Sequence, residues 1–212
     1  MIVKVCGVRT ADVAEAAIAA GADWLGLVFE PRSPRFVDDA TARHVVDAIQ
    51  DRVDVIGVFV EPTPEECEEA AARYRLAAVQ VHGDVDADFV TACDVAVIRG
   101  LNLGAGDTTA AMEWWPDLLV LLDSAARDGE LPGGTGRRVD IALAADVARH
   151  RRIILAGGLG PDDVADAITR VRPYGVDASS GLERAPGEKD ETLVQAYVST
   201  ARSAFTSLAA QP

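Results

Sequence analysis

A cysteine ends the first apolar segment of the chain. Residues 2–5 read Ile-Val-Lys-Val and are followed by Cys6 and Gly7. Such a segment predicts a short buried strand, with the thiol at its carboxyl end. In folds built from repeating strand–helix units, this end of the strands carries the reactive groups. Cys6 is therefore a candidate for proton transfer, nucleophilic attack, redox chemistry or metal binding.

An aspartate ends another apolar segment. Asp123 follows residues 118–122, which contain no polar side chain. It could cap the next turn, but its position after a fully buried strand favours a general acid or base. Cys6 would need to be a thiolate to act as a base, and a nearby cation would help. Lys4 is expected to point to the same side of the strand as Cys6, unless it forms a structural ion pair; the only other lysine is Lys189.

Small residues gather after the last two predicted strands. They are Gly157 and Gly158, then Ser179 and Ser180. Backbone N–H groups next to small residues can approach an anion closely, and these two loops form the usual phosphate site of (β/α)8 barrels. Glycines that merely turn the chain are the alternative, but the position of both loops favours a phosphate site.

Two further side chains are candidates for contact with a substrate. The guanidinium of Arg35 suits a carboxylate, with a solvated surface arginine as the alternative. His82 could be a base, a donor to the substrate or a buried structural histidine. Residues 124–138 form the longest irregular stretch, and that length indicates a functional loop. Its segment 133–136 could be a lid, with Thr135 as an extra contact, or a plain surface loop.

Composition excludes several classes of function. The formal net charge of −14 argues against nucleic-acid binding, which needs a basic surface. The longest apolar run, residues 118–122, is too short to cross a membrane. We interpret Cys67 and Cys93 as packing residues. Three cysteines without a CxxC pair indicate neither a disulfide framework nor a zinc site, and they suit a reducing, cytoplasmic location.

Almost all of the positive charge is arginine, and aspartate is spread over the predicted helices. A GC-rich genome would produce this composition. Adaptation to a high-salt cytosol is the interpretation we favour, because concentrated salt screens the repulsion between acidic side chains.

The segments that position these residues alternate regularly along the chain. Eight continuous apolar segments predict strands buried on both faces, at residues 2–5, 24–29, 53–60, 77–81, 95–98, 118–122, 153–156 and 175–178. Helices are predicted between them, at residues 10–20, 39–50, 65–74, 86–92, 108–115, 141–150, 161–171 and 191–208. Eight units of about 26 residues approach the lower size limit of a (β/α)8 TIM barrel. We therefore predict one α/β domain over residues 1–212; a doubly wound sheet is the alternative.

Seven motifs resemble, in order, those of the phosphoribosylanthranilate isomerase family of tryptophan biosynthesis. They lie at residues 4–10, 29–35, 57–60, 80–83, 122–124 with 133–136, 155–159 and 176–183. Any one of these motifs is weak, but their order over nearly the whole chain is specific. One departure is residues 137–141, where the family often carries an aromatic residue.

The resemblance implies a (β/α)8 barrel that needs no metal or cofactor and catalyses an Amadori rearrangement. By this resemblance, Cys6 removes the C2 proton of N-(5-phosphoribosyl)anthranilate, and Asp123 protonates the ribose ring oxygen. Arg35 would meet the anthranilate carboxylate. The phosphate would lie at four small residues, Gly157, Gly158, Ser179 and Ser180. The partner would be this small molecule alone, with no nucleic acid or membrane, and the protein would be a monomer or a homodimer.

Two other functions fit the sequence less well. A pentulose-phosphate epimerase or related phosphosugar isomerase would need histidines as metal ligands on several strands. Of the three histidines, His44 and His150 fall in predicted helices. A non-catalytic barrel that binds a phosphorylated ligand should lack one member of the acid–base pair, and both Cys6 and Asp123 are present. An isomerase is therefore favoured.

Overall fold

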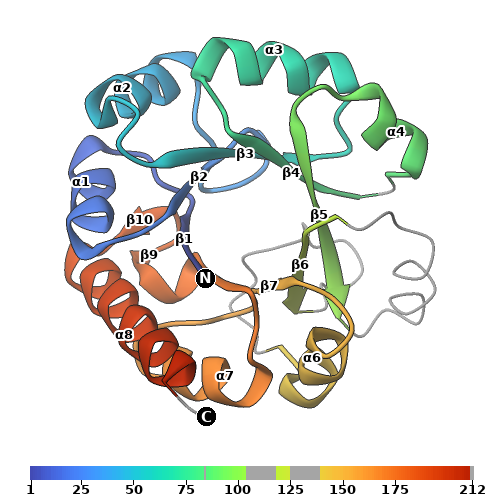
Figure 1. The fold of residues 1–212 in the computed structure, drawn as a ribbon. Helices are drawn as coiled ribbons and strands as arrows, with labels where there is room; N and C mark the ends of the chain where they lie inside the picture. The colour runs from blue at the N-terminus through green and yellow to red at the C-terminus, as the bar shows by residue number, and fades with distance from the viewer. Residues whose placement is uncertain (84, 104–117, 125–138, 211–212) are drawn as a thin grey trace.

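The computed structural model describes residues 1–83, 85–103, 118–124 and 139–210. Eight parallel strands close into a barrel in which each strand pairs with the next one in sequence and β8 pairs with β1 (Figure 1). The strands are β1 (Ile2–Cys6), β2 (Trp24–Val28), β3 (Asp54–Val60), β4 (Ala78–His82), β5 (Ala96–Leu103), β6 (Val120–Ser124), β7 (Ile153–Leu155) and β8 (Gly175–Ala178). The predicted (β/α)8 barrel is confirmed, and the doubly wound alternative is wrong.

Helices surround the barrel and follow the strands in turn (Figure 1). Within the described part of the chain they are α1 (Ala11–Ala20), α2 (Asp39–Ile49), α3 (Pro64–Tyr74), α4 (Ala87–Ala92), α6 (Ile141–Ala148), α7 (Val164–Val171) and α8 (Glu191–Ala209). Their starts follow from capping residues: Thr63 forms a reciprocal capping box with Glu66 and precedes a proline at the first helical turn. The helix predicted at residues 108–115 lies outside the described residues.

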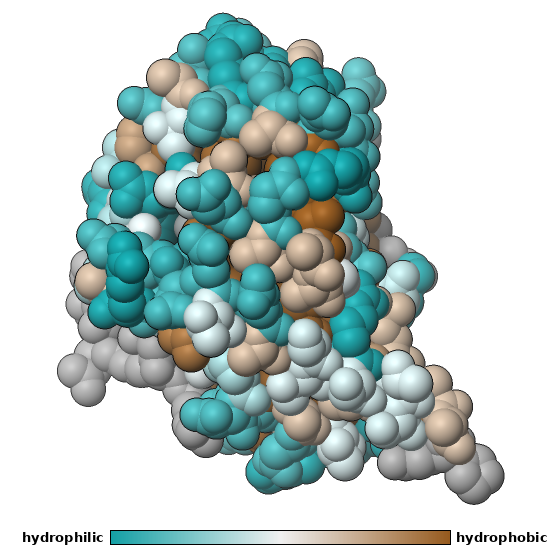
Figure 2. Space-filling view, turned by 90° about the vertical axis from the view of Figure 1, so that its left-hand side faces the viewer, coloured by the Kyte–Doolittle hydropathy of each residue, from teal (hydrophilic) through white to brown (hydrophobic). Residues whose placement is uncertain are grey.

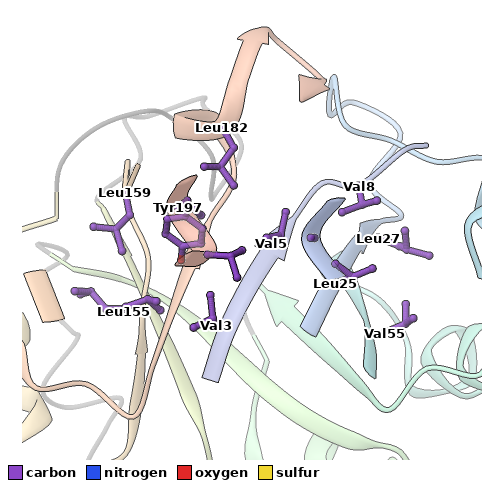
Figure 3. Close-up of a cluster of buried hydrophobic side chains, with 14 of the residues drawn as sticks. Val3, Val5, Val8, Leu25, Leu27, Val55, Leu155, Leu159, Leu182 and Tyr197 are labelled. Atoms are coloured by element: carbon purple, nitrogen blue, oxygen red, sulfur yellow. The ribbon is translucent and has the colours of Figure 1, made fainter. Parts of the chain in front are cut away.

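The larger part of the core lies between the strands and the helices. Outward-facing side chains of alternate strand positions, such as Val3, Val5 and Leu25, pack there with Tyr197 of α8 (Figure 3). A second cluster fills the barrel itself and consists of Ile56, Ala78, Ile98, Leu121, Ile154 and Ala156. Because strand side chains alternate between the two sides, the positions on β1 that face the barrel interior are those of Ile2, Lys4 and Cys6.

A short insertion separates β8 from α8. It contains a 3-10 turn (Ser180–Leu182) and a two-stranded hairpin of β9 (Glu183–Ala185) and β10 (Glu188–Lys189). The predicted pattern of elements did not include it. Because it follows the carboxyl end of β8, it lies at the rim where the candidate residues gather.

One side of the molecule is largely hydrophilic. Figure 2 shows the side of the molecule that carries α1, α2 and α8, and hydrophilic residues cover most of what is visible there. Apolar residues appear on this side only in small, separate patches. Within the described residues, no helix is both long and apolar enough to span a membrane.

Candidate active site

Cys6 lies at the end of β1, where little space surrounds its side chain. Its side chain is 7% exposed and clusters with Val28 and Val58. On the neighbouring strand, a Cβ placed on Gly26 would lie only 2.8 Å from the Cys6 Sγ. Gly26 is thus the residue that leaves room for the thiol. The chain turns immediately afterwards at Gly7, which has φ +77°, a conformation that favours glycine.

Charged groups surround this thiol. Burial raises the pKa of Cys6; the positive charges of Lys4 and Lys189 oppose that shift, whereas the charge of Asp177 adds to it. The Lys4 Nζ lies 3.0 Å from Asp177 Oδ2, and both side chains are buried. The Coulomb attraction to this carboxylate and to the Cys6 thiol raises the pKa of Lys4 although burial lowers it. Lys4 therefore keeps its positive charge inside the barrel.

Arg35 is held at the same rim by a carboxylate from the hairpin. Its Nε and Nη2 donate to the two oxygens of Glu183 at 2.7 and 2.9 Å. The Lys189 Nζ also donates to Glu183, at 2.5 Å. Burial would raise the pKa of Glu183, but these hydrogen bonds outweigh burial and lower it. Arg35 is buried, so the alternative of a solvated surface arginine is wrong.

Asp123 lies within β6 rather than after it, because the strand extends through Ser124. Its side chain is 6% exposed, and Oδ1 accepts hydrogen bonds from the Ser124 backbone N–H at 2.6 Å and from Ser124 Oγ at 3.3 Å. Gly157 follows β7 and approaches this carboxylate closely: a Cβ there would lie 3.3 Å from Asp123 Oδ1. The structure therefore brings the candidate acid next to one of the small-residue loops.

The two small-residue loops also contact each other. Gly157 and Gly158 both have positive φ, +88° and +65°, so the turn after β7 depends on glycine. A Cβ on Gly181, which follows Ser180, would overlap the carbonyl oxygen of Leu159. Ser179 Oγ donates to the Cys6 carbonyl oxygen at 3.1 Å. The loops after β7 and β8 are thereby joined to the end of β1.

His82 faces the barrel interior from the end of β4. It is 3% exposed, and its Nε2 lies 2.8 Å from Gln80 Nε2. A Cβ on Gly100 of the next strand would overlap the imidazole ring. Burial, together with the charges of Lys4 and Arg99, lowers the pKa of His82 to about 4. The imidazole is therefore neutral at physiological pH, which suits a wall or hydrogen-bonding role better than an acid.

Several residues at this rim were not given a role from the sequence. Asp177 and Glu183 lie within the 176–183 motif, but nothing in the motif indicates that they pair with Lys4 and Arg35. The only sequence signal for Lys189 is its rarity, because lysine occurs at two positions. Thr135 and the 133–136 lid candidate lie outside the described residues.

The other two cysteines fit the expected packing role. Cys67 of α3 is fully buried, and burial raises the pKa of its thiol to about 12. Cys93 is partly exposed, and burial also raises the pKa of its thiol. The charged neighbours of both thiols are carboxylates, which raise the pKa further, whereas two lysines oppose the rise at Cys6, so Cys67 and Cys93 form little reactive thiolate. Among the described residues, no group of three or more His, Cys, Asp or Glu side chains could hold a metal ion.

Comparison with known proteins gives one consistent family. A sequence profile described as N-(5'phosphoribosyl)anthranilate (PRA) isomerase matches residues 3–200. The enzyme of that name from Rubrobacter xylanophilus is 41% identical over 204 residues, which is 95% of this chain and 98% of the relative. The crystal structure of phosphoribosyl anthranilate isomerase from Thermotoga maritima has a TM-score of 0.86 at 32% identity, over 96% of this chain and 100% of that one.

A further structure is of a phosphoribosyl anthranilate isomerase in complex with reduced 1-(o-carboxyphenylamino)-1-deoxyribulose 5-phosphate. It has a TM-score of 0.83 at 31% identity and covers 96% of this chain and 100% of that one. Monomers generated from the dimeric Thermotoga maritima enzyme give a TM-score of 0.84 at 29% identity, with coverage of 96% and 100%.

Proposed function

Because the chain belongs to the N-(5'-phosphoribosyl)anthranilate isomerase family, we propose that Cys6 and Asp123 are the base and the acid of its reaction. The chain is an isomerase of tryptophan biosynthesis that acts on N-(5-phosphoribosyl)anthranilate. The observation that carries the assignment of residues is the placement of both side chains at the carboxyl ends of barrel strands. This end is where (β/α)8 enzymes carry out their chemistry.

The reaction requires two proton transfers. Asp123 gives a proton to the ribose ring oxygen, the C1–O bond breaks, and the anthranilate nitrogen forms a C1=N iminium. The Cys6 thiolate then takes the proton from C2, and the resulting enolamine becomes the ketone by tautomerisation. Gains of about 10²–10⁴ in rate are typical of positioned acids and bases. Hydrogen bonds from Ser124 to Asp123 hold the carboxyl group in place.

The two ends of the substrate are assigned to different loops of the rim. The phosphate is assigned to the loops after β7 and β8, at Gly157, Gly158, Ser179 and Ser180. Two observations support this assignment: both glycines have positive φ, and the two loops contact each other. Successive backbone N–H groups in such turns can form an anion-binding concavity. The anthranilate carboxylate is assigned to Arg35.

The ion pair between Arg35 and Glu183 determines how Arg35 would meet a substrate carboxylate. A guanidinium has five N–H donors, and Glu183 receives the donors of Nε and Nη2. The carboxylate of Glu183 fixes the plane of the guanidinium, so that a substrate carboxylate would meet an already oriented group. His82 and Gln80 line the barrel interior as neutral hydrogen-bonding groups, and His82 remains a candidate contact for the substrate.

The remaining assignments concern the cellular location, the oligomeric state and the cofactor requirement of the enzyme. We infer a cytoplasmic enzyme that acts on a small molecule as a monomer or a homodimer, without metal or cofactor. An acidic surface of this kind, with a net charge of −14 and little apolar exposure on the side seen in Figure 2, supports adaptation to a high-salt cytosol.

Substitution of each member of the pair tests the assignment. Cys6→Ser and Asp123→Asn should each reduce kcat by about 10²–10⁴-fold and still bind the reduced product analogue. Cys93→Ser is the matched control, because it makes the same change at a partly exposed thiol away from the rim, and it should retain turnover. Near-normal turnover in Cys6→Ser or Asp123→Asn would remove that residue from the mechanism.

A further inference from the structure

Both lysines of the chain lie beside Cys6. The sequence contains only Lys4 and Lys189, and every other basic residue apart from the three histidines is arginine. The two lysines come from β1 and β10, which are far apart in the sequence. Their exposed fractions are 0% and 8%, whereas lysine is almost never fully buried unless it is paired. Two buried ammonium groups near one thiol therefore indicate that the lysines have a functional role.

Lys4 approaches the thiol from inside the barrel. It lies two residues before Cys6 on the same strand, so both side chains point inward. Its ammonium donates to Asp177 Oδ2 at 3.0 Å, and its positive charge acts to lower the pKa of the Cys6 thiol. Asp177 keeps Lys4 charged, and this charge lies on the same side of the strand as the thiol.

Lys189 approaches from the hairpin at the rim. Its Nζ lies 3.5 Å from Ser179 Oγ and 3.2 Å from the place where a Cβ on Gly7 would lie. Gly7 directly follows the thiol, and Ser179 is bonded to the Cys6 carbonyl oxygen. Lys189 therefore lies against the peptide group that follows Cys6.

Five charged side chains of the described residues lie around Cys6. They are Lys4 and Asp177 inside the barrel, and Lys189, Arg35 and Glu183 at the rim, where the Arg35 side chain packs on Gly7. Glu183 is shared between Arg35 and Lys189, whereas Asp177 pairs with Lys4.

We propose that Lys4 and Lys189 are positioning residues that stabilise Cys6 as a thiolate, ready to take the C2 proton of the substrate. The inference rests on the proposed role of Cys6 as the base. Burial lowers the pKa of Lys189, and its hydrogen bond to Glu183 opposes that shift. The proton from C2 goes to Sγ, and neither lysine gives up a proton in this step. The pKa of Cys6 is raised by burial even with both lysines present, and without them it would rise further, toward that of Cys67 at about 12.

The test measures the ionisation of Cys6 directly and does not require turnover. The rate of Cys6 alkylation by iodoacetamide is followed against pH by mass spectrometry of the Cys6 peptide. We expect Lys189→Met to raise the apparent pKa of Cys6 by about 1 or more, so that alkylation at neutral pH is about tenfold slower. Lys4→Met should shift it in the same direction. Lys4→Met also leaves Asp177 buried without the ammonium group that pairs with it, and this loss could prevent folding. Lys189→Met is the decisive variant if Lys4→Met does not fold.

Arg9→Met is the matched control. Arg9 lies next to the hairpin and is bonded to the carbonyl oxygens of Pro34 and Gly187, but it is exposed and does not face Cys6. Its removal should leave the Cys6 titration and the turnover unchanged. An unchanged Cys6 titration in folded Lys189→Met would overturn the proposal, and a rise in KM with kcat unchanged would instead make Lys189 a substrate contact. Absence of turnover in the parent protein would contradict the proposed function alone, because alkylation is measured separately.

Discussion

Gly26 offers the sharpest test of how closely the position of the Cys6 thiol is controlled. A Cβ at Gly26 would lie 2.8 Å from the Cys6 Sγ and 3.0 Å from its Cα. Non-bonded heavy atoms prefer about 3.5–4.0 Å, so the Gly26→Ala methyl group must displace the thiol by about 1 Å. A displacement of that size at a reacting group can reduce the rate about 10²-fold, which corresponds to about 2.7 kcal/mol of transition-state stabilisation.

The control for this substitution is Gly57→Ala on β3. A Cβ there would lie 2.6 Å from Leu76 Cδ1 and 2.7 Å from Phe59 Cε2, on the side of the strand that faces the helices. Both variants should lose about 1–3 kcal/mol of unfolding free energy through overpacking, measured by urea titration. Only Gly26→Ala should lose kcat, with KM nearly unchanged. A folded Gly26→Ala protein with the kcat of the parent would refute the close positioning of the thiol.

Two further predictions concern Glu183 and the acidic surface. The pKa of Glu183 is lowered in the folded protein. Its ion pairs therefore stabilise the fold at pH values above the ordinary pKa of a glutamate, and that stabilisation is lost as the pH falls through the pKa of the folded state. Glu183→Gln should cost about 1.5–3 kcal/mol at pH 7 and flatten the acid side of the stability–pH curve measured by urea unfolding; an unaltered curve would exclude the ion pairs as its cause. The electrostatic screening length falls from about 10 Å at about 0.1 M KCl to about 3 Å at about 1 M KCl. Repulsion among the acidic side chains that give the net charge of −14 should therefore weaken, and the unfolding free energy should rise. Equal stability at low and multimolar KCl would contradict adaptation to a high-salt cytosol.

The sequence predicts the barrel well because its strands are buried on both faces. Continuous apolar segments mark such strands, and the proline and acidic residues after Thr63 mark the start of α3. The ends of strands are less certain: β5 extends to Leu103 and β6 extends to Ser124. The residue at which a strand ends depends on its hydrogen bonds to the adjacent strands, and a local sequence pattern carries no information about that pairing.

The reactive residues could be found from their positions at strand ends, but their partners could not. The pairing of Lys4 with Asp177 joins β1 to β8, and that of Arg35 with Glu183 joins the loop after β2 to the hairpin after β8. Both pairs arise only when the barrel closes. The sequence left open how Cys6 is ionised, and barrel closure places Lys4 and Lys189 beside it.

The central claim is that this chain converts N-(5-phosphoribosyl)anthranilate to its ribulose product by proton transfer through Cys6 and Asp123. The most direct measurement is the fluorescence of phosphoribosylanthranilate after addition of the purified protein, followed alongside the Cys6→Ser variant. We predict a rapid decay with the parent protein and, with the variant, a decay close to that of the substrate alone. A parent protein that leaves the fluorescence unchanged, or a variant that matches the parent, would contradict the account.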